Sequence, residues 1–74
     1  MKSQKEIKIT TDYITLGQLL KLASIIDHGG EAKLFLASNK VLVNGEEDNR
    51  RGRKLYPGYL VVIGSETFAI TRWS

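Results

Sequence analysis

The sequence contains no cysteine, which excludes disulfide bonds and metal sites built on thiolates. It has one histidine, His28, whose only potential partner nearby in the sequence is Asp27, so neither a metal centre nor histidine-based catalysis is expected. No apolar run approaches the roughly 18 residues of a membrane span, and the first residues lack the apolar segment of a signal peptide. No serine lies in a nucleophile motif, and no phosphate-loop pattern is present. These absences favour a cytoplasmic, non-catalytic protein without a cofactor.

Length and charge narrow the interpretation further. We expect the 74 residues to form one domain, 1–74, because a second domain would not fit. The apolar content of 42% and the charged content of 26% are typical of a folded protein. The net charge of +3 is mild, but four of the five residues from Arg50 to Lys54 are basic, and they follow the acidic triplet Glu46-Glu47-Asp48. An exposed basic loop is therefore the main electrostatic feature of the chain.

Apolar periodicity predicts two short helices after a first strand at 6–10, where apolar and polar residues alternate. The first helix is expected at about 16–25, because Thr15 and Gln18 form a capping box and apolar residues recur at helical spacing. Gly17 in its first turn costs about 1 kcal/mol relative to alanine, which indicates a close approach by another helix or by a ligand. The second helix is expected at 31–38, with Asn39 as a left-handed C-cap.

Strands and turns dominate the rest of the chain. Apolar runs predict strands at 41–43 and 60–63. After a turn at Gly64-Ser65, the last strand is expected at 67–73, with Trp73 clamping it onto the core. Asn44-Gly45 predicts a tight turn with positive φ at both residues, and the segment 56–59, Tyr-Pro-Gly-Tyr, predicts a type II turn. The fold class is therefore α+β. A helical hairpin packs on a small, mostly antiparallel sheet, in the order strand, two helices, then three or four strands.

The segment 15–63 resembles the S-four-type RNA-binding domain, named after a small-subunit ribosomal protein. The αL motif of that family is a helical hairpin followed by a β-ribbon, with blocks such as R-L-D-x-x-L, S-R-x-x-A-x-x-L-I, G-x-V-x-V-N-G and P-G-D. The size of the chain and its basic insert are similar to the small bacterial YaaA-like and YbcJ-like branch. The matching blocks are TLGQLL (Thr15–Leu20), HGGEAKLFL (His28–Leu36), NKVLVNG (Asn39–Gly45) and YPGY (Tyr56–Tyr59).

The resemblance implies RNA binding, with ribosomal RNA as the expected partner, but several charged family positions are neutral in this chain. Thr15 stands where the family has arginine, Gly17 where it has aspartate, and His28-Gly29 where it has Ser-Arg. Lys33 remains basic at its family position. These differences shift the expected contacts toward the loop after Asn44-Gly45.

The candidate RNA contacts follow from these patterns. Arginine matches phosphate oxygens with two parallel hydrogen bonds, and a glycine-rich helix start offers free N–H groups to an anion. In each case a structural role is the alternative: arginines paired with the acidic triplet, lysines solvated at helix ends, and Gly29-Gly30 as a plain capping turn. Lys21 is interpreted as ordinary surface. Tyr56 and Tyr59 either stack on bases or pack the turn onto the sheet. The candidates are Arg50, Arg51, Arg53, Lys54, Lys33, Lys40, Gly29, Gly30, Thr15 and Asn44.

Two functions from different classes remain at this point. The first is a monomeric RNA-binding protein that docks structured RNA through the helical hairpin and the Arg50–Lys54 loop, in ribosome assembly or at the ribosome surface. The second is a protein-interaction adaptor that places the same basic loop against an acidic protein surface. A third and weaker alternative is the recognition domain of an enzyme that lost or never had its catalytic partner, which co-purification of a second polypeptide would support. Because the first two are both electrostatic, a preference for RNA over an acidic polypeptide separates them.

Overall fold

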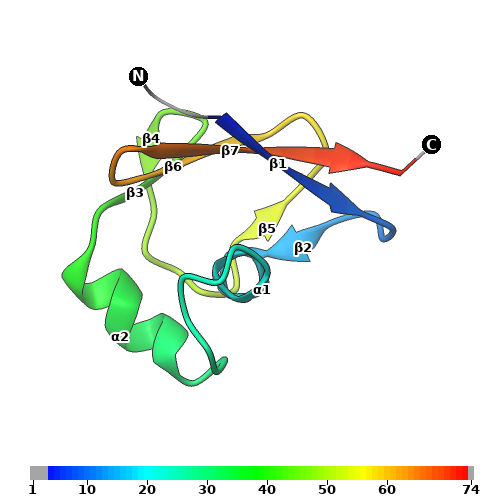
Figure 1. Cartoon of the computed structure of the whole chain (residues 1–74). Helices are drawn as coiled ribbons and strands as arrows, with labels where there is room; N and C mark the ends of the chain where they lie inside the picture. Colours follow the sequence, from blue (N-terminus) through cyan, green and yellow to red (C-terminus); the bar gives the residue numbers. More distant parts are fainter. Residues whose placement is uncertain (1–3, 74) are drawn as a thin grey trace.

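The computed structural model describes residues 4–73, and its element order confirms the predicted α+β class (Figure 1). Within that range neither helix is long and apolar enough to cross a membrane. The predicted strands and helices are all present, although some end at different residues. The elements are β1 (Gln4–Ile9), β2 (Ile14–Thr15), α1 (Leu16–Leu22), α2 (Glu31–Ser38), β3 (Val41–Val43), β4 (Glu46–Glu47), β5 (Lys54–Leu55), β6 (Leu60–Ile63) and β7 (Glu66–Arg72).

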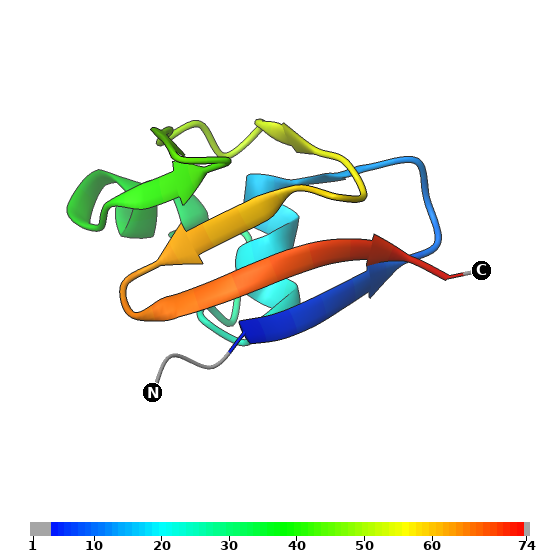
Figure 2. The ribbon, with the colours of Figure 1, turned by 90° about the horizontal axis from the view of Figure 1, so that it is seen from above.

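The main sheet has the strand order β1-β7-β6-β3-β4 and is mostly antiparallel, as predicted (Figure 2). Among the strands of residues 4–73 in this sheet, only β1 and β7 pair in parallel, with Ile7 opposite Ile70. A separate two-stranded ribbon joins β2 to β5, where Ile14 pairs with Leu55. The sequence pattern missed β2, β4 and β5, because a two-residue strand is too short to show alternation.

The core lies between the main sheet and the helices, which cover the same face of the sheet (Figures 1 and 2). The apolar side of α1 enters it completely, and Leu16, Leu19 and Leu20 have no exposed surface. On the sheet side, the largest buried side chain is Phe68. Because both helices are short, this tertiary packing is their main source of stability.

The capping box at the start of α1 is confirmed, but the helix ends at Leu22 and not at Ile25. Thr15 Oγ1 accepts a hydrogen bond from the N–H of Gln18, whose side chain accepts from the N–H of Thr15. The helix stops because Ser24 adopts a left-handed φ of 59°. The N–H of Ile25 then donates to the carbonyl of Leu20 at 2.9 Å, which closes a Schellman motif.

Two sequence-based predictions near strand and helix ends are wrong. Asn39 is extended, with φ −132°, and does not form a left-handed cap; its side chain instead donates to the carbonyl of Phe35 at 3.0 Å. Trp73 does not clamp β7 onto the core, since 58% of it is exposed and its ring lies under Lys8. Phe68 and Ile70 occupy the inward positions of β7, so the opposite parity of Trp73 directs it away from the core.

Both predicted turns are confirmed. Asn44 and Gly45 have φ values of 52° and 87°, as a tight hairpin turn between β3 and β4 requires. Gly58 has φ 97°, and the N–H of Tyr59 donates to the carbonyl of Tyr56 at 3.0 Å, as in a type II turn. The first turn leads into β4, which runs directly into the basic segment, and the second follows β5.

Candidate nucleic-acid interface

The basic loop, residues 48–54, is organised around the carboxylate of Asp48, whose side chain is only 9% exposed. Oδ1 of Asp48 accepts from the backbone N–H of Arg50 at 2.9 Å and from its Nε at 3.1 Å. Oδ2 accepts from Nη2 of Arg50 at 2.8 Å and from Nη1 of Arg53 at 3.2 Å. Two of the four loop cations among the predicted RNA contacts are therefore already paired with a carboxylate inside the loop.

The other two acidic residues of the triplet do not share this role. Glu46 and Glu47 form β4 and are exposed, and within residues 4–73 neither makes an ion pair with a loop arginine. The alternative in which the triplet neutralises the arginines therefore applies to Asp48 alone. Arg51 and Lys54 also make no ion pair in the described part of the chain, so they keep their charge available.

Hydrogen bonds from the Arg50 side chain are the main reason that the pKa of Asp48 falls from its ordinary value of 3.8 to about 2. Partial burial opposes this shift by raising the pKa, while the backbone N–H of Arg50 and the positive charges of Arg50 and Arg53 reinforce it. The same contact raises the pKa of Arg50. Asp48 is thus ionised at neutral pH, and its charge stabilises the loop in the folded state.

This arrangement predicts a pH-dependent difference between the wild type and Asp48→Asn. Because the folded-state pKa lies below the ordinary value, the stabilisation is complete above about pH 4 and is lost as the pH falls toward about 2. We expect the substitution to lower the free energy of unfolding by about 1 kcal/mol near neutral pH. Urea unfolding followed by circular dichroism over this pH range checks it. A difference that stays constant down to the acid end would contradict the assigned role of Asp48.

A second attachment holds the basic loop against the start of α1. The N–H of Leu16 donates to the carbonyl of Arg53, and the N–H of Gly17 donates to the carbonyl of Arg51, both at 2.9 Å. The first N–H groups of a helix have no partner within the helix, so the loop satisfies groups that would otherwise need water. The loop is consequently fixed at both ends, by Asp48 and by α1.

The close approach predicted at Gly17 is made by both the other helix and the basic loop. A Cβ atom added at Gly17 would lie 3.4 Å from the carbonyl oxygen of Arg51 and 3.6 Å from Cβ of Ala32. These are ordinary contact distances, so one methyl group fits, although a larger side chain would displace the loop.

Gly17→Ala is therefore expected to preserve the fold and to raise the free energy of unfolding by about 0.5–1 kcal/mol, because alanine has the higher helix propensity. Urea unfolding of the two proteins measures the difference. Gly17→Val is the informative partner, since its additional methyl groups would press on Arg51 and should destabilise the protein. Equal destabilisation by alanine and valine would show that the space at Gly17 is already full.

Between α1, the start of α2 and the basic loop lies a hollow of about 300 Å³, which we call the helix groove. Three of the predicted RNA contacts line it although they are distant in the sequence: Thr15, Gly29 and Arg51. It also contains Lys21, which the sequence-based interpretation left as ordinary surface. The groove is lined by Thr15, Gly17, Gln18, Lys21, Gly29, Ala32, Arg51 and Gly52.

Lys21 is the functional candidate that the sequence interpretation missed, although a signal was present. It lies four residues after Gly17, and residues at this spacing share one face of a helix. If a glycine in a helix allows a close approach to one face, the residue four positions later lies on that same face and is also a candidate for contact. In the described residues 4–73 Lys21 makes no ion pair, and it reaches the same groove as Arg51.

Comparison with known proteins identifies the family. A family model described as "S4 domain" matches residues 7–71. The chain belongs to the S4 domain family. It is also 63% identical over 57 residues to a protein of Bacillus subtilis (strain 168) named "Probable ribosome maturation protein RlbA", an alignment that covers 77% of this chain and 80% of that protein. The resemblance inferred from the αL motif is thereby confirmed.

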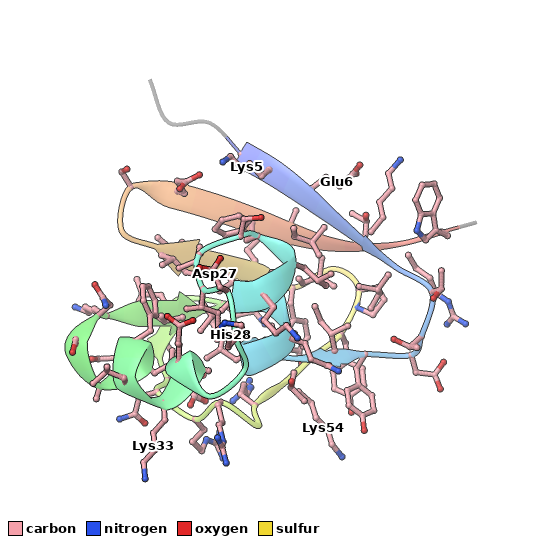
Figure 3. The ribbon with its side chains drawn as sticks, turned by 60° about the horizontal axis from the view of Figure 1, so that its bottom comes forward. Lys5, Glu6, Asp27, His28, Lys33 and Lys54 are labelled. Carbon is pink, nitrogen blue, oxygen red and sulfur yellow. The ribbon has the colours of Figure 1, made fainter. Side chains whose placement is uncertain are left out.

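The remaining sequence candidates of this S4 domain occupy three different places. Lys33 lies in the first turn of α2, and Figure 3 shows it projecting from the same side of the molecule as Lys54. Lys40 is exposed beyond the other end of α2, before β3. Asn44 holds the β3–β4 turn against β6, since its Oδ1 accepts from the N–H of Leu60 at 2.9 Å. We therefore assign Asn44 a structural role.

The Gly29-Gly30 turn of the S4 domain is closed by a carboxylate. Oε1 of Glu31 accepts from the N–H of His28 at 2.9 Å and from the N–H of Asp27 at 3.2 Å. Gly30 is the N-cap of α2, and no side chain caps the helix at this position. The negative charge beside this turn favours the capping-turn interpretation over an anion site, whereas Gly29 still lines the helix groove.

Proposed function

We propose that this protein is a non-catalytic RNA-binding protein that acts in ribosome maturation and docks structured ribosomal RNA through its helix groove. The observation that carries the proposal is the presence of two cations, Lys21 and Arg51, in one groove between elements that are distant in sequence. Membership of the S4 domain family supports RNA as the partner, and the name of the Bacillus subtilis relative supports ribosome maturation as the setting.

The charges divide into two groups with different expected contributions. Four cations have no partner among the ion pairs of residues 4–73, namely Arg51, Lys21, Lys33 and Lys54. Each can therefore neutralise a phosphate without first breaking an ion pair. Arg50 and Arg53 contact Asp48, and a phosphate would have to compete with that carboxylate. We therefore assign phosphate binding chiefly to the first group and loop organisation to Arg50 and Arg53.

The shape of the helix groove suits a folded RNA backbone. Gly17, Gly29 and Gly52 line it without side chains, which lets a phosphate approach the main chain closely. Thr15 Oγ1 uses one lone pair as the acceptor from Gln18, which leaves its proton for a phosphate oxygen. Such contacts read the shape and charge of an RNA helix and not its base sequence.

Competition binding tests this function. A labelled, structured ribosomal RNA fragment is titrated with the protein, and unlabelled RNA or polyglutamate is then added as competitor. We expect unlabelled RNA to displace the labelled RNA at a much lower concentration of negative charges than polyglutamate does. The reason is that only RNA matches the helix groove in shape. Equal competition by both polymers would favour the adaptor for an acidic protein surface, and an absence of binding to the labelled RNA would refute the proposal.

A further inference from the structure

Three tyrosines form a cluster beside the basic loop that phosphate binding leaves unexplained. The ring centroid of Tyr56 lies 5.5 Å from that of Tyr13 and 5.7 Å from that of Tyr59. The ring planes meet at 47° and 60°, so neither pair is a parallel stack in which one ring covers the face of the other. Tyr13 is 38% exposed and Tyr56 is 40% exposed. The cluster therefore presents an aromatic surface to solvent.

The tyrosine cluster borders a second hollow, of about 530 Å³, which we call the tyrosine hollow. Its size falls within the roughly 300–1,000 Å³ of small-molecule sites. Gly52 lines both this hollow and the helix groove, so the two sites adjoin across the basic loop. The tyrosine hollow is lined by Arg50, Gly52, Arg53, Lys54, Tyr56 and Tyr59.

A cation accompanies the aromatic surface. Nζ of Lys54 lies 5.1 Å from the ring centroid of Tyr13, and Lys54 makes no ion pair within residues 4–73. Lys54 is thus held over the cluster by a cation–π contact while its charge stays free for an anion. An aromatic face and an unpaired ammonium group next to one another match the two parts of a nucleotide, the base and the phosphate.

The turn at 56–59, which carries Tyr56 and Tyr59, does not depend on the Tyr56 side chain. The N–H of Gly58 donates to the carbonyl of Ile70 at 2.7 Å, and the N–H of Ile70 donates to the carbonyl of Tyr59 at 3.0 Å. With the turn bond between Tyr59 and Tyr56, these backbone contacts fix the segment 56–59 on β7. The Tyr56 ring is therefore available to a ligand, and its removal should leave the turn intact.

We propose that the tyrosine hollow binds one unpaired nucleotide of the RNA, with its base stacked on Tyr56 and its phosphate on Lys54. This inference rests on the proposed function and adds a requirement for a base that lies outside the RNA helix. Paired bases are stacked within the helix and present no free face, whereas a bulged or looped base does. The helix groove then holds the backbone of the RNA, and the adjoining tyrosine hollow selects RNA with an extruded base.

The test combines two changes in a double-mutant cycle, measured by fluorescence anisotropy. The RNA is a short stem-loop with one bulged adenosine, and its matched control carries an abasic nucleotide at the bulge, so the phosphates are unchanged. Wild-type protein is expected to bind the abasic RNA about tenfold more weakly, while Tyr56→Ala binds both RNAs equally at the weaker level. Tyr56→Phe, which keeps the ring and loses only the hydroxyl, is expected to behave as the wild type does.

A second variant controls for the possibility that Tyr56→Ala disturbs the turn at 56–59. Tyr56→Leu retains apolar packing but lacks the flat ring, so it should also fail to distinguish the two RNAs. The inference is overturned if wild-type protein binds both RNAs equally, or if Tyr56→Ala and Tyr56→Leu still prefer the bulged adenosine. If the inference is overturned but the wild type still binds the stem-loop in a salt-dependent way, the proposed function stands. If the wild type does not bind the stem-loop at all, the inference and the proposed function are both refuted.

Discussion

The double substitution Lys21→Ala, Arg51→Ala is expected to weaken binding to structured RNA about a hundredfold at low salt. Each side chain supplies one charge-assisted contact to phosphate, worth about 1.5 kcal/mol or more, which corresponds to about tenfold in affinity. The slope of log affinity against log salt concentration should also fall by about 1.5 units, because two phosphates are no longer neutralised. Fluorescence anisotropy across a salt series measures both quantities.

The matched control removes two lysines from the opposite side of the molecule. Figure 3 shows Lys5 on the side of the molecule opposite Lys33 and Lys54. Lys5 and Lys8 both lie on β1, where Lys5 pairs with Glu66 and Lys8 pairs with Glu6. The variant Lys5→Ala, Lys8→Ala loses the same formal charge, so any general effect of net charge appears in both proteins. We expect its salt slope to match the wild type. If the two variants lose affinity equally, binding follows net charge and the helix groove is not the site.

The behaviour of the basic loop shows what the sequence could and could not predict about the site. The concentration of arginine after Asn44-Gly45 is visible in the sequence, and the structure places all four cations on one loop. Their division into paired and free charges depends on where β4 stops. Because the strand ends at Glu47, Asp48 turns toward Arg50 and Arg53, while Glu46 and Glu47 remain on the strand. Backbone pairing with β3 positions all three acidic residues, since the N–H of Asp48 still donates to the carbonyl of Val41 at 3.0 Å, and composition does not encode this pairing.

The fold was more predictable than the site, and for a physical reason. The helices and the longer strands have periodic burial, and Thr15, Gln18 and Gly58 carry local backbone signals that act within a few residues. The β2–β5 ribbon carries no such signal, since it pairs two residues with two others far along the chain. The helix groove depends on this ribbon, which places the end of the basic loop beside the start of α1. Long-range contacts of this kind are absent from any local pattern.

Leu55 links this ribbon to the core, and Leu55→Ala is expected to lower the free energy of unfolding by about 2–4 kcal/mol. Leu55 has no exposed surface, so the truncated side chain would leave a cavity among packed neighbours. A chain of 74 residues has a total stability of only about 4–11 kcal/mol, so the loss is a large share of it. Urea unfolding monitored by circular dichroism gives the value directly.

Leu34→Ala provides the control for this prediction, because Leu34 is 72% exposed on α2 and the chemical change is the same. Its effect should stay within about 0.5 kcal/mol. Leu55 also directly follows the basic loop, so the Leu55 variant should bind RNA more weakly even at temperatures where it remains folded. If Leu55→Ala were no more destabilising than Leu34→Ala, the ribbon would not be packed into the core. The loop would then have only Asp48 and the first turn of α1 to hold Arg51 in the helix groove.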